Sequence, residues 1–257
     1  MSKPMRSKAL MSLAALASGV MLLWGQADAA TRILPLGDSR VQGGRPEFES
    51  YRYELWKRLV TEGADIDLIG PRFDDAPYRP FMGEPFDRNH AGVGGFTTAD
   101  VLSTLNDTLD MIEVPDVVLL GIGGNDLLAG IPVRTAVTNV VAIINLLRER
   151  NPEVSVIVEQ IAPGRSDIMT AQLTASFNAF NQGVATAAQR LSTARSPVLA
   201  VDMAEGWFDR NMADEVHYNV RGAIVVANRY LEALLPQIQP TQIWAANLQR
   251  STAHEGP

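Results

Sequence analysis

Short apolar runs alternate with longer amphipathic stretches along most of the chain. Val117-Val-Leu-Leu120 is continuous and carries β-branched residues, which is typical of a strand covered on both faces. Ile143, Ile144 and Leu147 instead recur at the spacing of one helix face. The pattern predicts strands at 32–36, 66–69, 117–122, 154–161 and 198–201, and helices at 51–62, 98–109, 135–150, 171–191 and 220–235.

This alternation of strands and helices predicts an α/β fold. We expect a three-layer α/β/α sandwich around a five-stranded parallel sheet, with the functional face formed by the loops that follow the strands. The connection 71–96 is longer than folding alone requires and contains four prolines and several aromatic residues. It is interpreted as an ordered binding loop over the crevice, with a variable surface insertion as the alternative.

The two ends of the chain differ in character from its middle. Residues 1–29 combine Lys3, Arg6 and Lys8 with an apolar run and end in Ala27-Asp-Ala29, which is the pattern of a signal peptide. The apolar run, at about 16 residues, is shorter than the roughly 20 of a membrane-spanning helix. We therefore expect a secreted or periplasmic protein without stable membrane insertion after cleavage, an uncleaved anchor being the alternative. Residues 30–236 would form one domain, and 237–257 a partly disordered C-terminal extension.

Charge and composition exclude several functions. The 257 residues carry a net charge of −7, and removal of 1–29 would make it about −9. The negative charge argues against nucleic acid as a partner, because nucleic-acid binding relies on clustered Lys and Arg. The chain has no cysteine and three histidines, which argues against thiolate chemistry, disulfides and a dedicated zinc site. We expect no metal and no organic cofactor, and the oligomeric state is left open.

The first predicted strand ends in Gly37-Asp38-Ser39. Because ligands of open α/β sheets collect at the carboxyl ends of strands, a serine hydroxyl here would face a crevice. The alternative is a polar turn or a helix cap at Asp38 and Ser39.

A histidine with a nearby carboxylate precedes the last predicted helix. Asp214 lies three residues before His217 and can fold back to bind one ring nitrogen, leaving the other to accept a proton from a serine. Asp209 is a rival for the orienting acid. A surface Asp-x-x-His that caps the last helix is the alternative interpretation.

Two glycine-rich turns follow other predicted strands. Gly121-Ile-Gly-Gly-Asn125-Asp126 comes directly after 117–120 and offers the Asn125 amide as a donor at the same sheet edge as Ser39. Gly92-Val-Gly-Gly95 could offer a backbone N–H to a developing oxyanion. No G-x-S-x-G, P-loop, H-E-x-x-H or complete dinucleotide fingerprint occurs.

Taken together, Gly37-Asp-Ser39, Gly95, Gly123-Gly-Asn125-Asp and Asp214-x-x-His217 resemble the four ordered blocks of the SGNH, or GDSL-type, hydrolases. The resemblance spans about 32–235 and implies a flavodoxin-like sandwich. It also implies that Ser39 is the nucleophile and His217 the base oriented by Asp214. The oxyanion hole would consist of the Ser39 N–H, Gly95 and Asn125.

A narrower resemblance connects the chain to the acetylxylan esterases of carbohydrate esterase family three. It rests on Tyr51-Arg-x-Glu-Leu55, His90-x-Gly-x-x-Gly-Phe-Thr97, the run 115–120 and Phe208-Asp-Arg-Asn211. Val93-Gly94 replaces the polar pair expected before Gly95, and Arg40 follows Ser39 where a small or apolar residue is usual. These departures leave the acyl pocket and the sugar preference open.

The resulting hypothesis is a serine esterase for short acyl esters, acetyl above all, of carbohydrates or small alcohols, acting through an acyl-enzyme. Asp38, Asp126 and His90 are assigned to substrate binding, with a loop hydrogen bond as the alternative for His90. A longer-chain lipase, thioesterase, lysophospholipase or acyltransferase with the same triad is the enzymatic alternative. A catalytically silent glycan-binding protein is the non-enzymatic one.

Overall fold

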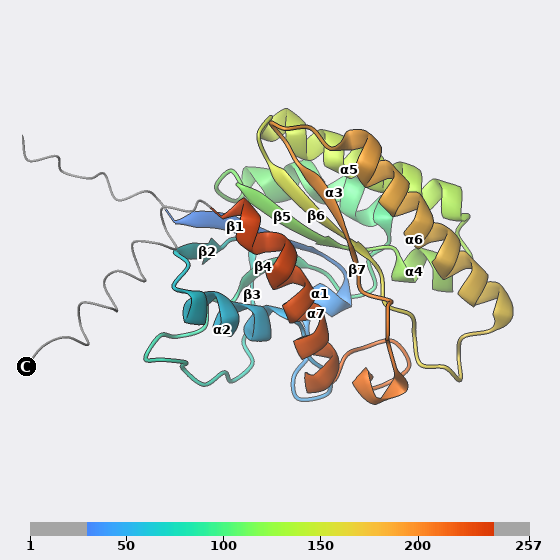
Figure 1. Ribbon diagram of the computed structural model, residues 1–257, viewed down its shortest axis with the longest axis horizontal. Coiled ribbons are helices and arrows are strands. Elements are labelled where there is room, and N and C mark those ends of the chain that lie inside the picture. The colour runs from blue at the N-terminus through green and yellow to red at the C-terminus, as the bar shows by residue number, and fades with distance from the viewer. Residues whose placement is uncertain (1–29, 239–257) are drawn as a thin grey trace, which may run out of the picture.

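The computed structural model of the protein describes residues 30–238 (Figure 1). The expected signal peptide and positions 239–257 of the expected extension lie outside the described residues. The strands are β1 (Thr31–Gly37), β2 (Ile66–Leu68), β3 (Arg72–Phe73), β4 (Asn89–Gly92), β5 (Val117–Gly121), β6 (Ser155–Gln160) and β7 (Val198–Asp202). The helices are α1 (Ser39–Gln42), α2 (Arg52–Glu62), α3 (Thr98–Asp110), α4 (Gly124–Leu128), α5 (Val133–Arg150), α6 (Ala171–Leu191) and α7 (Val220–Leu234), with 3-10 turns η1 (Asp209–Asn211) and η2 (Leu235–Gln237). None of the helices within 30–238 has the length and apolar character that crossing a membrane requires.

The strands form one mostly parallel sheet in the order β3-β4-β1-β5-β6-β7, with β2 also paired to β1. The five expected strands are all present and pair in parallel, which confirms the predicted α/β sandwich, and the sheet is larger than expected because β3 and β4 add to it. Both are short and lie in the expected loop 71–96; β4 reads Asn-His-Ala-Gly and therefore lacks an apolar run. β3 runs antiparallel to β4, whereas the other pairs are parallel.

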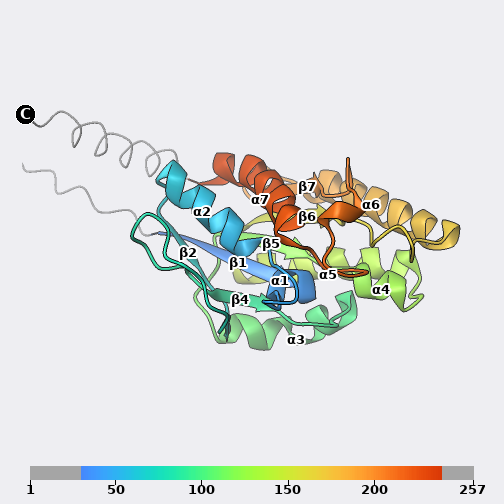
Figure 2. The same ribbon diagram turned by 90° about the horizontal axis from the view of Figure 1, so that it is seen from below.

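Helices cover both faces of the sheet, as the alternating pattern predicts. Figure 2 shows α2 and α7 on one side of the strands and α3 on the other. Side chains of β1 divide accordingly: Leu34 and Leu36 pack with α3, α5 and α6, and Ile33 packs with α2 and α7. This period-two division explains why the central strands read as continuous apolar runs.

Glycines at the carboxyl ends of three adjacent strands bring α1 close to the sheet. Gly37 pairs with Gly92 of β4 on one side and with Gly121 of β5 on the other. A Cβ atom on Gly37 would lie 1.9 Å from the Gly121 carbonyl oxygen, and one on Gly92 would lie 2.4 Å from the Gln42 nitrogen. Only glycine permits this approach, which seats the start of α1 on the sheet edge.

The connection 71–96 is ordered, but much of its aromatic surface is used for packing. Phe86 is 6% exposed, and its ring lies 5.4 Å from that of Trp56 on α2 and 4.7 Å from that of Tyr78. Phe81 also packs against this cluster. These three rings of the predicted binding loop thus anchor it to α2, and its last residues, 93–96, are the ones that reach the region of Ser39.

Candidate active site

Ser39 is the first residue of α1, directly after β1. The side chain of Asp38 caps this helix, since its Oδ1 accepts a hydrogen bond from the Arg40 N–H at 2.9 Å. The cap predicted as the alternative for Asp38 is therefore present, and it sets the direction in which Ser39 leaves the strand. The Ser39 hydroxyl lies at the rim of the sheet with part of its surface open to solvent.

His217 and Asp214 lie next to this hydroxyl. His217 Nε2 is 2.9 Å from Ser39 Oγ, and His217 Nδ1 is 2.7 Å from Asp214 Oδ2. The Asp214 carboxylate favours the tautomer with the proton on Nδ1, which leaves Nε2 to accept the serine proton. Two distant segments of the chain, one with Ser39 and one with Asp214 and His217, thus form one continuous series of hydrogen bonds, the arrangement that makes a serine hydroxyl nucleophilic.

The same carboxylate also shapes the turn that carries the histidine. Asp214 Oδ1 accepts hydrogen bonds from the N–H groups of Val216 at 2.8 Å and His217 at 2.7 Å. Partial burial raises the pKa of Asp214, but these bonds and the one to the His217 ring outweigh it and hold the pKa below its usual range. Asp214 is therefore ionised at neutral pH.

Asp209, the rival acid, binds elsewhere. Its two carboxylate oxygens accept hydrogen bonds from the N–H of Ser166 at 2.8 Å and the hydroxyl of Ser166 at 2.5 Å. Asp209 thus connects η1 to the segment that follows β6, and the acid that orients His217 in this structure is Asp214.

The expected oxyanion donors Asn125 and Gly95 lie on two loops that neighbour the loop of Ser39. Asn125 lies at the start of α4, and its Nδ2 donates a hydrogen bond to the Phe96 carbonyl at 2.8 Å. This bond fixes the orientation of the amide and uses one of its two N–H donors, so the second remains for another acceptor. Gly94 donates to Gln42 Oε1 at 2.5 Å, and a Cβ atom on Gly94 would lie 3.9 Å from that of Ser39. Gly95 has a φ of +80° and forms the next step of this turn. The loops after β4 and β5 thus lie next to Ser39, Gly94 through the 3.9 Å approach of its Cβ position and Asn125 through the cavity it shares with Ser39.

The residues assigned to substrate binding are largely buried. Asp126 is fully buried, and its carboxylate accepts hydrogen bonds from the Thr98 N–H at 2.8 Å and the Thr98 hydroxyl at 2.6 Å. His90 is 3% exposed, and its Nδ1 accepts from the Gly92 N–H at 3.1 Å. Burial, with the positive charge of Arg52, lowers the pKa of His90 to about 3, so the ring is neutral. The substrate role assigned to Asp126 and His90 stays a prediction; in this structure Asp126 binds Thr98, and His90 binds the backbone of Gly92.

Asp38, the third residue assigned to substrate binding, is buried and also lines the cavity next to Ser39. It is 5% exposed, and burial raises its pKa even though Arg40 lies nearby. It lines, together with Ser39 and Asn125, a cavity of about 20 Å³. Its side chain is already bound to the Arg40 N–H, so its position indicates support for Ser39 more than contact with a substrate.

Two residues that the motifs do not include complete the site. The Arg40 guanidinium donates to the carbonyls of Val216 at 2.7 Å, Ala162 at 2.7 Å and Pro163 at 3.3 Å. Phe48 stacks on His217, with ring centroids 3.9 Å apart and planes 17° apart. No local pattern could have identified either contact, because Arg40 and Phe48 lie more than 160 residues from His217 in the sequence.

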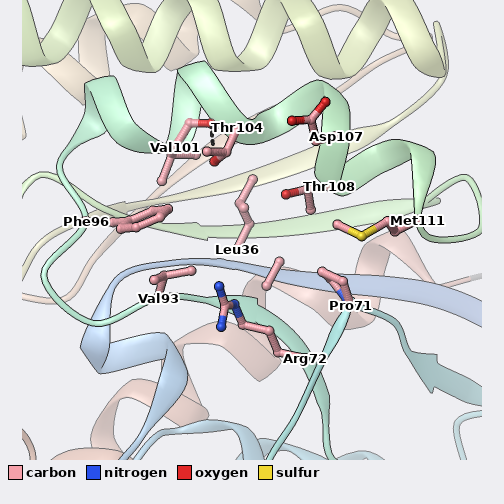
Figure 3. A pocket seen from close by; sticks show the side chains of 11 residues that line it. Leu36, Pro71, Arg72, Val93, Phe96, Val101, Thr104, Asp107, Thr108 and Met111 are labelled. Atoms are coloured by element: carbon pink, nitrogen blue, oxygen red, sulfur yellow. Dashed lines mark hydrogen bonds between the residues drawn. The ribbon is translucent and has the colours of Figure 1, made fainter.

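A second, larger cavity lies beside the Gly92–Gly95 turn and is shown in Figure 3. Its volume is about 420 Å³, and it lies between the β1–β4 side of the sheet and α3. Val93 and Phe96 lie at one end and Pro71 and Met111 at the other, and the Arg72 guanidinium lies near Val93, opposite Thr104 of α3 (Figure 3). The Val93–Phe96 turn therefore separates this cavity from Ser39. Within residues 30–238, no group of three or more His, Asp or Glu side chains is arranged to hold a metal ion.

Comparisons with known proteins agree with this geometry. Residues 36–223 match the model of the family described as GDSL-like Lipase/Acylhydrolase. A multidomain esterase of Ruminococcus flavefaciens is 33% identical over 114 residues, which are 38% of this chain and 15% of that protein. An arylesterase of Vibrio mimicus is 26% identical over 136 residues, 52% of this chain and 58% of that protein. The chain thus spans less than two thirds of the length of both relatives.

Solved structures match over nearly their full length. A carbohydrate esterase family 3 protein from Talaromyces cellulolyticus has a TM-score of 0.70 at 26% identity, covering 81% of this chain and 98% of the other. A family 3 carbohydrate esterase of Clostridium thermocellum has a TM-score of 0.66 at 27% identity, covering 82% of this chain and 100% of the other. Both resemblances inferred from the sequence motifs, the broad one and the narrow one, are confirmed.

Proposed function

Because the chain belongs to the GDSL-like lipase/acylhydrolase family, we propose that it is a serine esterase that removes short acyl groups, acetyl above all, from oxygens of carbohydrates or small alcohols. The observation that carries the proposal is the pair of contacts at His217, 2.9 Å to Ser39 Oγ and 2.7 Å to Asp214 Oδ2. The substrate class is supported by the similarity of the chain to a carbohydrate esterase of family 3 and to an acetyl esterase of known structure. The charged start and apolar run of residues 1–29 support export to the periplasm or the medium.

The proposed reaction uses these residues in order. Ser39 Oγ attacks the ester carbonyl while His217 Nε2 takes its proton, and the oxyanion is held by the N–H groups of Ser39 and Gly95 and the amide of Asn125. His217 then gives the proton to the leaving alcohol oxygen as its bond to carbon breaks. Water then attacks the acyl-enzyme while His217 Nε2 takes its proton. The proton passes to Ser39 Oγ as its bond to the acyl carbon breaks, which releases the acid and restores the enzyme.

The space beside the nucleophile supports a short acyl group. The cavity lined by Ser39, Asn125 and Leu128 measures about 20 Å³, which is near the volume that one water needs. A long chain does not fit in a space of this size directly beside Ser39, which supports a small ester such as an acetate.

Replacing the nucleophile tests the proposal. Ser39→Ala should lower kcat for p-nitrophenyl acetate by at least about 10⁴-fold, because alanine has no hydroxyl group that could attack the ester carbonyl. Circular dichroism and the melting temperature should match the wild type. Ser103→Ala, at an exposed serine of α3 that binds the Asp100 carbonyl, is the matched control and should keep full activity. Wild-type rates in Ser39→Ala would refute the assignment, and binding of glycans without hydrolysis of any ester would favour a silent binding protein.

Esters of longer acids are the second candidate substrates. The cavity of Figure 3 favours them, because Val93, Phe96 and Met111 give it apolar walls close to the oxyanion turn. Rates for p-nitrophenyl acetate, octanoate and dodecanoate separate the two. If the protein is a short-chain esterase, kcat/KM should fall steeply from acetate to octanoate. A maximum at octanoate or dodecanoate would instead identify it as a lipase or thioesterase.

A further inference from the structure

A third cavity, here named the α6 cavity, lies on the other side of Ser39 from the one in Figure 3. Its volume is about 300 Å³, and it is enclosed by the segment after β6, the first turns of α6 and the loop before η1. Its walls include Ser166, Thr174, Phe177, Asn178, Trp207 and Asp209. None of these residues takes part in the proposed catalytic steps.

The α6 cavity adjoins the nucleophile. It shares Gly164 and Phe177 with the small cavity that Ser39 lines. The segment that separates them is held to the histidine loop, since the Arg165 N–H donates to the Glu215 carbonyl at 2.8 Å. A Cβ atom on Gly164 would lie 2.9 Å from the same carbonyl oxygen, so a side chain there would press against the loop.

The topology of the sheet assigns this side to the alcohol part of an ester. Loops after β4, β1 and β5 supply the oxyanion donors, whereas loops after β6 and β7 enclose the α6 cavity, so the two lie at successive positions along one sheet edge (Figure 1). The leaving alcohol oxygen must receive its proton from His217 Nε2. The alcohol is therefore expected to leave on the side where the histidine loop meets the segment at Gly164.

The chemistry of the walls indicates what kind of alcohol fits. Thr174 and Asn178 offer a hydroxyl and an amide, and an alkyl chain packed against them would leave these groups without partners, whereas the Ser166 hydroxyl is already bound to Asp209. Asn181 also lines the cavity; it is 8% exposed, and its Oδ1 accepts no hydrogen bond among the described residues. Pockets for small molecules usually begin at about 300 Å³, which is the size found here and suits a single ring.

Two further features of the cavity wall, the Trp207 ring and the charge of Asp209, limit which ligands can bind. Trp207 is held in place by a hydrogen bond from Nε1 to Met212 Sδ at 3.2 Å and by edge contact with the Tyr218 ring, so it can serve as a rigid aromatic wall. The lining contains the carboxylate of Asp209 and no lysine or arginine. Hydrogen bonds from Ser166 hold the pKa of Asp209 below its usual range, so the wall is negatively charged and disfavours an acidic sugar.

We propose that the α6 cavity is the binding site for the alcohol half of the substrate, a neutral monosaccharide unit that carries the ester. This rests on the proposed function, since it places one part of an ester substrate relative to Ser39. The oxyanion donors hold the carbonyl, and the α6 cavity selects the sugar by its ring face and hydroxyl groups.

The test compares two acetate esters, p-nitrophenyl acetate and a mono-O-acetylated methyl β-xylopyranoside. Asn178→Ala and Trp207→Leu should each lower the ratio of kcat/KM for the sugar ester to kcat/KM for the aryl ester by about tenfold, chiefly through a higher KM for the sugar ester. Asn178 is exposed on α6, so its substitution should leave folding intact even where Trp207→Leu does not. Gln189→Ala, at an exposed position of the same helix that lines no described cavity, is the control and should leave the ratio unchanged.

Other outcomes overturn the inference. An unchanged ratio in both variants, or equal losses on the two esters, would show that the cavity does not select the sugar. A selective loss on p-nitrophenyl octanoate would assign it to the acyl chain instead. Binding of methyl β-xylopyranoside to Ser39→Ala protein, measured by calorimetry, is independent of turnover and should weaken about tenfold when Asn178→Ala is added. If the wild type hydrolyses neither ester, the proposed function fails, and this binding measurement alone decides the inference.

Discussion

At the scale of single residues, the side chain next to the nucleophile holds the site together. Arg40 donates to carbonyls of the segment after β6 and of the histidine loop, and its guanidinium carbon lies 4.9 Å from the centre of the Tyr218 ring. A planar side chain with five donors can make these bonds at once, whereas lysine cannot. Arg40 is thus a positioning residue for His217, and this explains why a small residue is not needed after Ser39.

We expect Arg40→Met to lower kcat/KM for p-nitrophenyl acetate about 10- to 100-fold, because the histidine loop loses its hydrogen bond from Arg40 to the Val216 carbonyl and is held less precisely. Arg40→Lys should recover only part of this loss, mostly in kcat. Arg32→Met is the control, since Arg32 binds Asp116 at the opposite end of β1. If Arg40→Met and Arg32→Met reduce the melting temperature equally while both keep full kcat, Arg40 has no role beyond stability.

A buried acid beneath the site makes stability depend on pH. Glu159 is 2% exposed and accepts a hydrogen bond from the Tyr230 hydroxyl at 2.8 Å. Burial raises the pKa of Glu159 from 4.5 to about 7, with Tyr230 and Arg40 opposing the shift. An acid with a higher pKa in the folded state binds its proton more tightly there than in the unfolded chain. The free energy of unfolding therefore falls as pH rises from about 4.5 to 7, and above pH 7 it stays lower by the full amount that burial of the ionised carboxylate costs.

Glu159→Gln keeps the shape and the acceptor for Tyr230 but removes this cost. The free energy of unfolding of Glu159→Gln should exceed that of the wild type by a few kcal/mol at pH 8, and the difference should shrink towards zero near pH 5. Urea denaturation at pH 5, 6, 7 and 8 measures it. A difference that is constant across this range, or that grows at low pH, would contradict the shift.

At the scale of elements, the buried Asp126 connects two helices. It lies in α4 and accepts two hydrogen bonds from Thr98, the first residue of α3. Thr98 also receives a hydrogen bond from Asn139 of α5 at 3.0 Å, so three helices meet at this point. The motif residue Asp126 therefore contributes to structure, and a substrate contact is not needed to explain it.

Asp126→Ala should lower the free energy of unfolding by about 3 kcal/mol, because it leaves buried donors of Thr98 without an acceptor. For a chain of this size that corresponds to about 6–12 °C in melting temperature. Asp107→Ala, at an exposed position of α3, should shift it by about 2 °C or less. A raised KM with an unchanged melting temperature would instead support the substrate role.

The sequence predicted elements with strong periodicity and missed those without it. The strands around 117–121 and 155–160 are found because burial on both faces requires continuous apolar residues. Predicted bounds differ from the observed ones by few residues at most ends; α5, for example, begins at Val133, two residues earlier than predicted. β4 is missed because its paired residues include His90 and Gly92, whose burial depends on neighbours distant in sequence.

The site was predictable to the extent that it is local in sequence. Asp214 and His217 are three residues apart, so their contact follows from a single turn. The 178-residue separation between Ser39 and His217 is bridged only by the topology, which brings the end of β1 next to the loop before α7. Phe48 and Arg40 could not be assigned in this way, since stacking and carbonyl binding leave no spacing rule in the sequence.

At the scale of the whole molecule, the order of strands arranges function along one edge. From β4 to β7 the loops carry in turn the Gly92–Gly95 turn, Ser39, Asn125 and the walls of the α6 cavity. Each step is one strand spacing of about 4.8 Å. An ester placed with its carbonyl over Ser39 thus has separate surroundings for its oxygen and its alcohol, set by the sheet and not by any one loop.

The sheet and its two covering layers also define how much chain the domain needs. Within residues 30–238, the two core clusters begin at Ile33 and end at Ile238, which is 1% exposed. Ile238 lies two residues beyond the predicted domain end at 236, in the part assigned to the C-terminal extension. Its N–H donates to the Leu234 carbonyl at 3.2 Å, so the residue continues the end of α7 into the core.

We expect a chain of residues 30–238 to melt within about 2 °C of the chain 30–257 and to hydrolyse p-nitrophenyl acetate at a similar rate. A chain of residues 30–236 should melt about 5–10 °C lower, because loss of a buried isoleucine costs about 2–5 kcal/mol. Ile238→Ala in the chain 30–257 is the matched control and should show a comparable decrease, which separates loss of the side chain from shortening of the backbone. Equal melting temperatures for chains 30–236 and 30–238 would mean that Ile238 adds nothing to the core and that the domain ends where the sequence pattern placed it.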